Sequence, residues 1–247
     1  YHTGLSRRSK LLSVLPIEVQ APETKFQLLF TLPYFQPDIY NLPLMKFFDK
    51  KLHASIHWRN LPHWSQGDAV QFITFRLADS LPQSKLEEYA KIRKQIYYEQ
   101  NNEVRKAIQQ QVLDRLDYWL DQGYGSQYLG DPKIRQIVAD AMHHWDGERY
   151  QLLAYVIMPN HLHILLIPAH GDDIYSTFQS IKRYTAVKIN KYLQRSGSIW
   201  ENDMFDYMPR NYDEFNNQLN YIIDNPNKLC KSSYTLWLRP SEEQNDV

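Results

Sequence analysis

The stretch Tyr-Gln-Leu-Leu-Ala-Tyr-Val-Ile-Met-Pro-Asn-His-Leu-His-Ile-Leu-Leu-Ile, residues 150–167, decides the fold. It contains two runs rich in β-branched and aromatic residues, 150–157 and 161–167, separated only by Met-Pro-Asn. Such runs are typical of strands, and parallel neighbours would need a crossover of a dozen or more residues. The stretch therefore predicts an antiparallel strand pair.

Hydrophobic periodicity on both sides of this pair predicts the remaining elements. In chain order they are a strand at 70–77, helical segments within 83–122, a helix after Asp131-Pro132 that ends before Gly147, the strand pair, a basic amphipathic helix at about 174–193, a short extended stretch around 204–207 and a last helix from about Asp213 to Pro226. The stripe within 83–122 fits core packing or a helical hairpin better than a ligand site. This order predicts an α+β fold of ferredoxin-like topology, with an antiparallel sheet covered by helices on one face.

Composition narrows the class of protein. The chain has 247 residues, enough for one large domain with a sizeable core, and its one cysteine, Cys230, allows neither a disulfide scaffold nor a cysteine-based zinc site. No apolar run reaches the length of a membrane helix, and no secretory signal opens the chain, so we expect a cytoplasmic protein. Lys and Arg equal Asp and Glu at 28 each, which excludes nucleic-acid binding by bulk charge but not by a local patch.

Two histidines share the second strand of the pair. His161 and His163 are two residues apart, so their side chains would point to one face while Leu162 points to the core. Two imidazoles placed in this way could bind one metal ion. A His-x-His triplet also arises by chance in roughly one such sequence in three, so the pair alone leaves a metal role open.

A second polar pair lies at the end of the last expected helix, before Pro226. Tyr221 and Asn225 are four residues apart and therefore share a helix face. Asn225 would lie at the negative end of the helix dipole, which favours a nearby cation, so a phenol and a carboxamide could face the same metal as the histidines. In isolation, a surface tyrosine and a helix-ending Asn-Pro would be the simpler interpretation.

Basic residues gather in the segment 174–200, which contains no Asp or Glu. The residues that we expect to contact DNA there are Lys182, Arg183, Tyr184, Lys188, Lys191 and Arg195. Lysine and arginine track phosphates, and tyrosine stacks on bases. The segment carries a charge of +5, which the zero net charge of the whole chain conceals. A solvated helix face with core tyrosines is the alternative, and Tyr184 is also a second candidate nucleophile.

Several motifs occur in a fixed order along the chain. They are LPHW at 61–64, FITFRLADSLP at 72–82, YVIMPNHLHILL at 155–166, IKRYTAVKIN at 181–190, IWENDMFD at 199–206 and YIIDNP at 221–226. Taken together, they resemble the REP-associated tyrosine transposases, which belong to the single-tyrosine HUH transposases. The resemblance covers about residues 60 to 230, and the combination is far more specific than the histidine pair alone.

The resemblance implies an HUH endonuclease that binds single-stranded or hairpin DNA. By position, Tyr221 matches the nucleophile, and His161, His163 and Asn225 match the ligands of a divalent ion, magnesium or manganese. It implies that DNA is cut and rejoined through a 5′-phosphotyrosine intermediate. No Walker-type glycine-rich loop is present, so we expect no nucleotide cofactor.

The resemblance also divides the chain. It implies an N-terminal extension at 1–59, a transposase domain at 60–230 with a helical insert at 83–122, and a C-terminal tail at 231–247. We expect a monomer or homodimer that is cytoplasmic, is nucleoid-associated when bound to DNA, and does not bind membranes. Two other classes of function stay open. One is a domesticated protein that binds hairpin nucleic acid without cutting it, and the other is a metal-dependent hydrolase, which would leave Tyr221 without a role.

Overall fold

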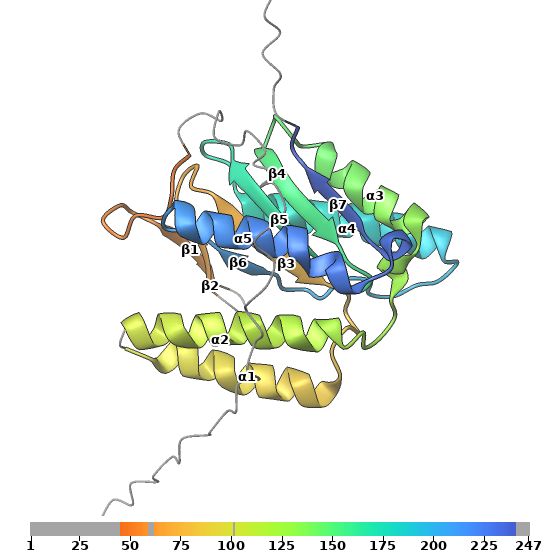
Figure 1. The fold of residues 1–247 in the computed structure, drawn as a ribbon, viewed down its shortest axis with the longest axis horizontal. Coiled ribbons are helices and arrows are strands. Elements are labelled where there is room, and N and C mark those ends of the chain that lie inside the picture. Colours follow the sequence, from red (N-terminus) through yellow and green to blue (C-terminus); the bar gives the residue numbers. More distant parts are fainter. Residues whose placement is uncertain (1–44, 59–61, 101, 241–247) are drawn as a thin grey trace, which may run out of the picture. The chain divides into compact units, whose positions relative to one another are not determined.

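The computed structural model describes residues 45–58, 62–100 and 102–240 (Figure 1). The chain divides into two units, 1–36 and 37–247, and the described residues all belong to the second. Most of the predicted N-terminal extension lies outside them. The elements are β1 (Ser55–Trp58), β2 (Pro62–Ser65), β3 (Gln71–Arg76), α1 (Gln83–Tyr98), α2 (Asn102–Asp121), η2 (Tyr128–Gly130), α3 (Pro132–His143), β4 (Tyr150–Ile157), β5 (His161–Pro168), α4 (Ile174–Tyr192), β6 (Phe205–Tyr207), α5 (Tyr212–Asp224), η3 (Asn225–Lys228), η4 (Lys231–Ser233) and β7 (Thr235–Leu238).

A five-stranded antiparallel sheet forms the centre of the described unit. Its strand order is β6-β3-β5-β4-β7, and the predicted antiparallel pair is β4 and β5. Strands β3, β4, β5 and β6 have the order of a ferredoxin-like sheet, with α3 and α4 in the two crossover positions. The predicted α+β class and topology are confirmed.

Helices cover both faces of this sheet rather than one. On one face, Ile73, Leu162 and Ile164 pack with α3 and α4. On the other, Phe72 and Leu165 pack against α5. The prediction of helices on one face is correct for α3 and α4 and wrong for α5. Because β3, β4 and β5 are apolar on both sides, each face needs a cover.

The segment 83–122 forms a helical hairpin of α1 and α2, as its periodicity indicated. Leu116, Trp119 and Leu120 pack with Tyr89 in a small core of their own. Gly125, just after the hairpin, has a φ of +75°, and a Cβ atom there would lie 2.1 Å from the carbonyl oxygen of Asp79. Only glycine permits this approach, which brings the end of the hairpin close to the end of β3.

Three short strands were not predicted. β1 and β2 form a separate two-stranded sheet, and β7 pairs with the edge of β4. β7 lies within the segment 231–247 that the resemblance assigned to a tail. Four-residue strands carry too little periodicity to be recognised in a sequence. No helix of the described part of the chain is long and apolar enough to span a membrane.

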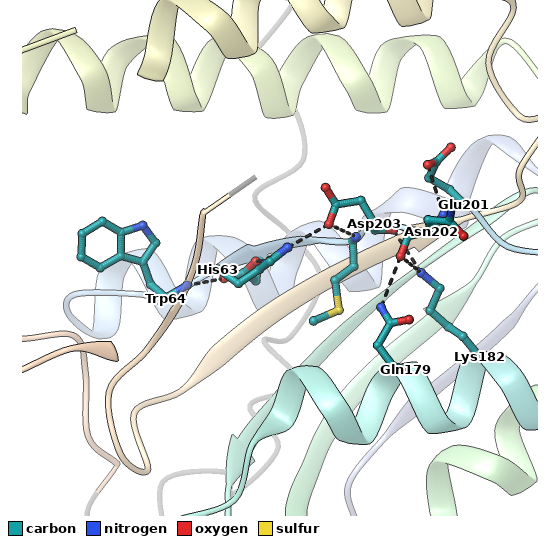
Figure 2. Close-up of polar contacts among 9 residues, drawn as sticks. His63, Trp64, Gln179, Lys182, Glu201, Asn202 and Asp203 are labelled. Atoms are coloured by element: carbon teal, nitrogen blue, oxygen red, sulfur yellow. Dashed lines mark hydrogen bonds and ion pairs between the residues drawn. The ribbon is translucent and has the colours of Figure 1, made fainter. Parts of the chain in front are cut away.

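The side chain of His63 in β2 binds one acidic residue in the loop before β6 and another in β6 itself (Figure 2). Its Nε2 atom lies 2.8 Å from Oδ1 of Asp203, and its Nδ1 atom pairs with Asp206. Burial alone would lower the pKa of His63, but the two carboxylates outweigh it and raise the pKa to about 9. His63 is therefore an imidazolium that holds two acidic residues at neutral pH.

A pH-dependent stability follows from this cation. Because the folded-state pKa lies above the ordinary value of 6.5, the stabilisation by His63 is fully present below pH 6.5 and is lost as the pH rises towards 9. The free energy of unfolding is measured in urea at pH 6 and at pH 9. We expect it to fall by on the order of 2–3 kcal/mol more in the wild type than in His63→Gln between these two pH values. Parallel pH profiles for the two proteins would contradict this expectation.

Candidate active site

The two histidines of β5 lie on the α5 face of the sheet, as the two-residue spacing predicts. Both are buried, and their ring centroids are 4.8 Å apart. His163 stacks on Phe72 of β3, with ring centroids 5.5 Å apart. The pair is therefore held between the sheet and α5, away from α3 and α4.

Each histidine has one nitrogen fixed by a neighbour. Nδ1 of His161 donates to Oδ1 of Asn160, 2.7 Å away, because the amide nitrogen of Asn160 already donates to the carbonyl oxygen of Leu120. Nδ1 of His163 lies 2.7 Å from Oγ1 of Thr74. Such contacts fix the tautomer and the ring orientation of histidines that bind metals. Nε2 of His161 is thereby left with a free lone pair.

Burial keeps both imidazoles neutral. It lowers the pKa of His161 to about 3 and that of His163 well below its usual range, and the positive charge of Lys228 adds to both effects. Lys228, in the turn after α5, is ion-paired with Asp121 of α2. A neutral imidazole is the form that binds a metal ion.

Tyr221 extends from α5 towards the histidine pair. Its hydroxyl lies 3.4 Å from Nε2 of His163, and the side chains of Asp117 and Asn225 are close enough to shift its pKa. Burial, followed by the charge of Asp117, raises the pKa of Tyr221 far above its ordinary value of 10. In this resting arrangement the phenol is protonated at neutral pH, so it needs nearby positive charge before it can act as a nucleophile.

Asp117 is the site residue that the sequence did not reveal. It comes from α2 of the helical hairpin, about a hundred residues before Tyr221, and its Oδ1 atom lies 3.9 Å from Nε2 of His163. Burial raises the pKa of Asp117 to about 7, although the hydrogen bond from Tyr221 opposes the shift. A lone Asp on an amphipathic helix gives no sequence signal of such a contact.

This raised pKa predicts a stabilising substitution. The charged form of Asp117 is disfavoured in the folded protein, so Asp117 destabilises the fold progressively as the pH rises from about 4 to above 7. Unfolding in urea is measured with EDTA present. We expect the free energy of unfolding of Asp117→Asn to exceed that of the wild type by on the order of 2 kcal/mol at pH 8 and by little at pH 4.5. Asp140→Asn, exposed on α3, is the control because its charge is not among those that shift the pKa of Asp117. An equal gain at both pH values would refute the effect.

Asn225 lies just beyond α5, where its side chain is buried next to Tyr221. Among the described residues, neither Oδ1 of Asn225 nor Nε2 of His161 has a hydrogen-bond partner. Buried polar atoms without partners are rare, and both atoms are of a type that can bind a metal ion. Two imidazoles and a carboxamide therefore fit a divalent ion that takes further oxygens from a substrate. The described residues contain no group of three or more His, Cys, Asp or Glu that could bind a metal by themselves.

The residues expected to contact DNA lie on the other side of the sheet, along α4 and the turn after it. Arg183, Tyr184, Lys188 and Lys191 are exposed, and Arg195 is half-buried against the ring of Tyr128. Lys182 is different because it is 5% exposed and donates to the carbonyl oxygens of Asn202 and Asp203 (Figure 2). Its ammonium group is used within the protein and is not presented to a ligand.

The described unit is an α+β protein with a ferredoxin-like sheet. On one face, buried His161, His163 and Asn225 lie with the partly buried Tyr221. No protein-family model and no curated protein match the chain. Among solved structures, it is similar to a REP-associated tyrosine transposase bound to a REP hairpin. The identity is 16%, the match covers 70% of this chain and 73% of that one, and the TM-score is 0.39. A similarity this weak supports no functional conclusion.

Proposed function

We propose that this protein is a single-strand DNA endonuclease and strand transferase that uses Tyr221 as its nucleophile. The observation that carries the proposal is the convergence of Tyr221, His161, His163 and Asn225, which come from β5 and from the end of α5. The same four residues are those that the ordered sequence motifs assign to the nucleophile and metal ligands of a tyrosine transposase.

The donor set suits a divalent ion, magnesium or manganese, held by His161, His163 and Asn225. Bound by these residues, such an ion would supply positive charge to the phosphate and to the developing phenolate. Three neutral ligands leave that charge undiminished. The nearby carboxylate of Asp117 would attract such an ion, but its negative charge opposes ionisation of Tyr221. The positive charge of Lys228 partly offsets that of Asp117.

The reaction exchanges one ester for another. The oxygen of Tyr221 attacks phosphorus, a 5′-phosphotyrosine bond forms, and the bond from phosphorus to the 3′ oxygen breaks. The phenol proton is lost from Tyr221, and the leaving 3′ oxygen gains a proton, so no water is consumed. His163 and Asp117 orient the hydroxyl of Tyr221 before attack. The ester conserves the bond energy, so the reverse reaction rejoins strands without a nucleotide cofactor.

DNA would have to contact two faces of the sheet. The basic residues Arg183, Lys188 and Lys191 lie on α4, and Tyr221 lies on the opposite face. The loop before β6 lies at an edge of the sheet, between these two faces. Lys182 of α4 donates a hydrogen bond to this loop, so the loop lies beside the basic helix. We infer that a hairpin rests on α4 while its unpaired end passes around this edge to Tyr221.

A covalent adduct tests the proposed function. The full chain is incubated with a hairpin oligonucleotide that has single-stranded flanks, in manganese or magnesium, and the products are separated on a denaturing gel. We expect a band of DNA linked to protein that protease treatment removes. Binding without an adduct in either metal would favour a domesticated hairpin-binding protein. Cleavage without an adduct would favour a hydrolase.

A further inference from the structure

A cavity of about 230 Å³ lies between the sheet and the helical hairpin, next to the candidate active site. Its walls include Arg76 and Thr74 of β3, Tyr89 of α1, and Asp203 and Phe205 near β6. It is smaller than the roughly 300–1,000 Å³ pockets that take drug-sized ligands, so it suits one flat ring rather than a whole nucleotide.

Asp203, which lines the cavity, carries a hydrogen-bond acceptor to which no described residue donates. Asp203 is 9% exposed, and its Oδ2 atom has no hydrogen-bond partner among the described residues. The other oxygen, Oδ1, is bonded by Nε2 of His63 at 2.8 Å and by the backbone nitrogen of Met204 at 3.1 Å. A buried carboxylate oxygen without a donor is costly and indicates a missing partner.

Asp203 is also held rigidly. His63 binds its carboxylate, and the ammonium of Lys182 donates to its backbone carbonyl at 3.1 Å. In Figure 2 these two residues hold the loop from opposite sides, and the second carboxylate oxygen points towards the helices of the hairpin. An acceptor fixed in this way is preorganised for a donor that enters from the cavity.

The other charges of the cavity are already paired. Arg76 donates to Glu201 at 3.0 Å and to Ser80 at 3.2 Å. The free acceptor therefore favours a ligand that brings its own hydrogen-bond donor. The aromatic rings of Tyr89 and Phe205 favour a flat ligand, since bases stack on such side chains.

We propose that this cavity binds one unpaired nucleobase that bears an exocyclic amino group, and that Asp203 accepts a hydrogen bond from that group. Carboxylates accept in this way from the amino group of cytosine. Adenine and guanine carry amino groups too. Thymine has none, and its single N–H donor lies between two carbonyl oxygens, which a nearby carboxylate would repel. The inference rests on the proposed function, and it assigns part of the sequence specificity of the same site.

The cavity adjoins the reacting residues. Thr74 lines it and lies 2.7 Å from Nδ1 of His163, and Leu116 lines it next to Asp117. A strand that places its phosphate at Tyr221 therefore has a neighbouring base within reach of the cavity. The selected base is one close to the cleavage position, on the path around the β6 edge.

The test measures binding in a background that cannot cut. Full-length Tyr221→Phe protein is titrated against fluorescent hairpin oligonucleotides in which each flanking base is replaced in turn by thymine. We expect replacement at one position to weaken binding by about 5- to 100-fold. At that position, an analogue that lacks only the amino group, such as inosine for guanosine, should cause a similar loss.

Variants connect this preference to the cavity. Asp203→Asn should reduce the discrimination at the sensitive position to less than about twofold, and Leu86→Trp should do the same by filling the cavity. Asp206→Asn is the matched control because it removes a carboxylate from the same histidine without lining this cavity, so discrimination should persist. Thermal melting of each variant verifies that it is folded.

The outcomes separate the two proposals. Adduct formation without any base preference, or discrimination that survives in folded Asp203→Asn and Leu86→Trp, overturns the nucleobase site and leaves the proposed function intact. Failure of the wild type to bind or cut any of the oligonucleotides overturns both.

Discussion

Substituting Tyr221 by phenylalanine is expected to abolish the covalent protein–DNA adduct and to slow strand cleavage by at least about 10³-fold. The change removes one oxygen atom, which is the atom that would attack phosphorus. The ring that packs with Phe72 and His163 is retained. Binding of hairpin DNA should therefore stay within about twofold of the wild type, because the loss affects the chemical step.

Adduct yield on a denaturing gel measures the chemical step, and fluorescence anisotropy measures DNA binding. Tyr184→Phe is the control, since Tyr184 is exposed on α4, across the sheet from the histidines. It should keep full adduct formation. If Tyr184→Phe loses the adduct and Tyr221→Phe retains it, the nucleophile is on the other face of the sheet and the proposed mechanism is wrong.

Removal of either histidine should produce the second large effect. We expect His161→Ala and His163→Ala to weaken manganese binding by at least about 10²-fold and to suppress adduct formation at any practical metal concentration. Thr74→Val should have a smaller effect, about 10-fold, because Thr74 only orients His163 through the 2.7 Å contact. Manganese binding is measured by electron paramagnetic resonance with a hairpin oligonucleotide present.

A histidine elsewhere distinguishes this effect from a general loss of packing. His143 is half-buried on α3, where its ring lies 4.8 Å from that of Trp237. His143→Ala should lower thermal stability and leave manganese binding unchanged. Wild-type manganese affinity in both His161→Ala and His163→Ala would show that the pair is not a metal site.

Much of the fold was predictable because it depends on local periodicity. Residues two apart on a strand share a face whatever the rest of the chain does, so His161 and His163 had to point together. The three-residue link required β4 and β5 to be antiparallel. The cover of the second sheet face by α5 was not predictable, since an amphipathic helix does not specify which apolar surface it will meet.

The candidate site divides in the same way. The sequence by itself determined the pairing of the histidines, the shared helix face of Tyr221 and Asn225, and the antiparallel sheet, because each follows from a spacing of a few residues. Only the tertiary structure decided that Asp117 meets Tyr221, that Lys182 is used internally, and that Asp203 has an oxygen free beside a cavity. These facts depend on how segments far apart in the chain pack, and side-chain spacing carries no information about that.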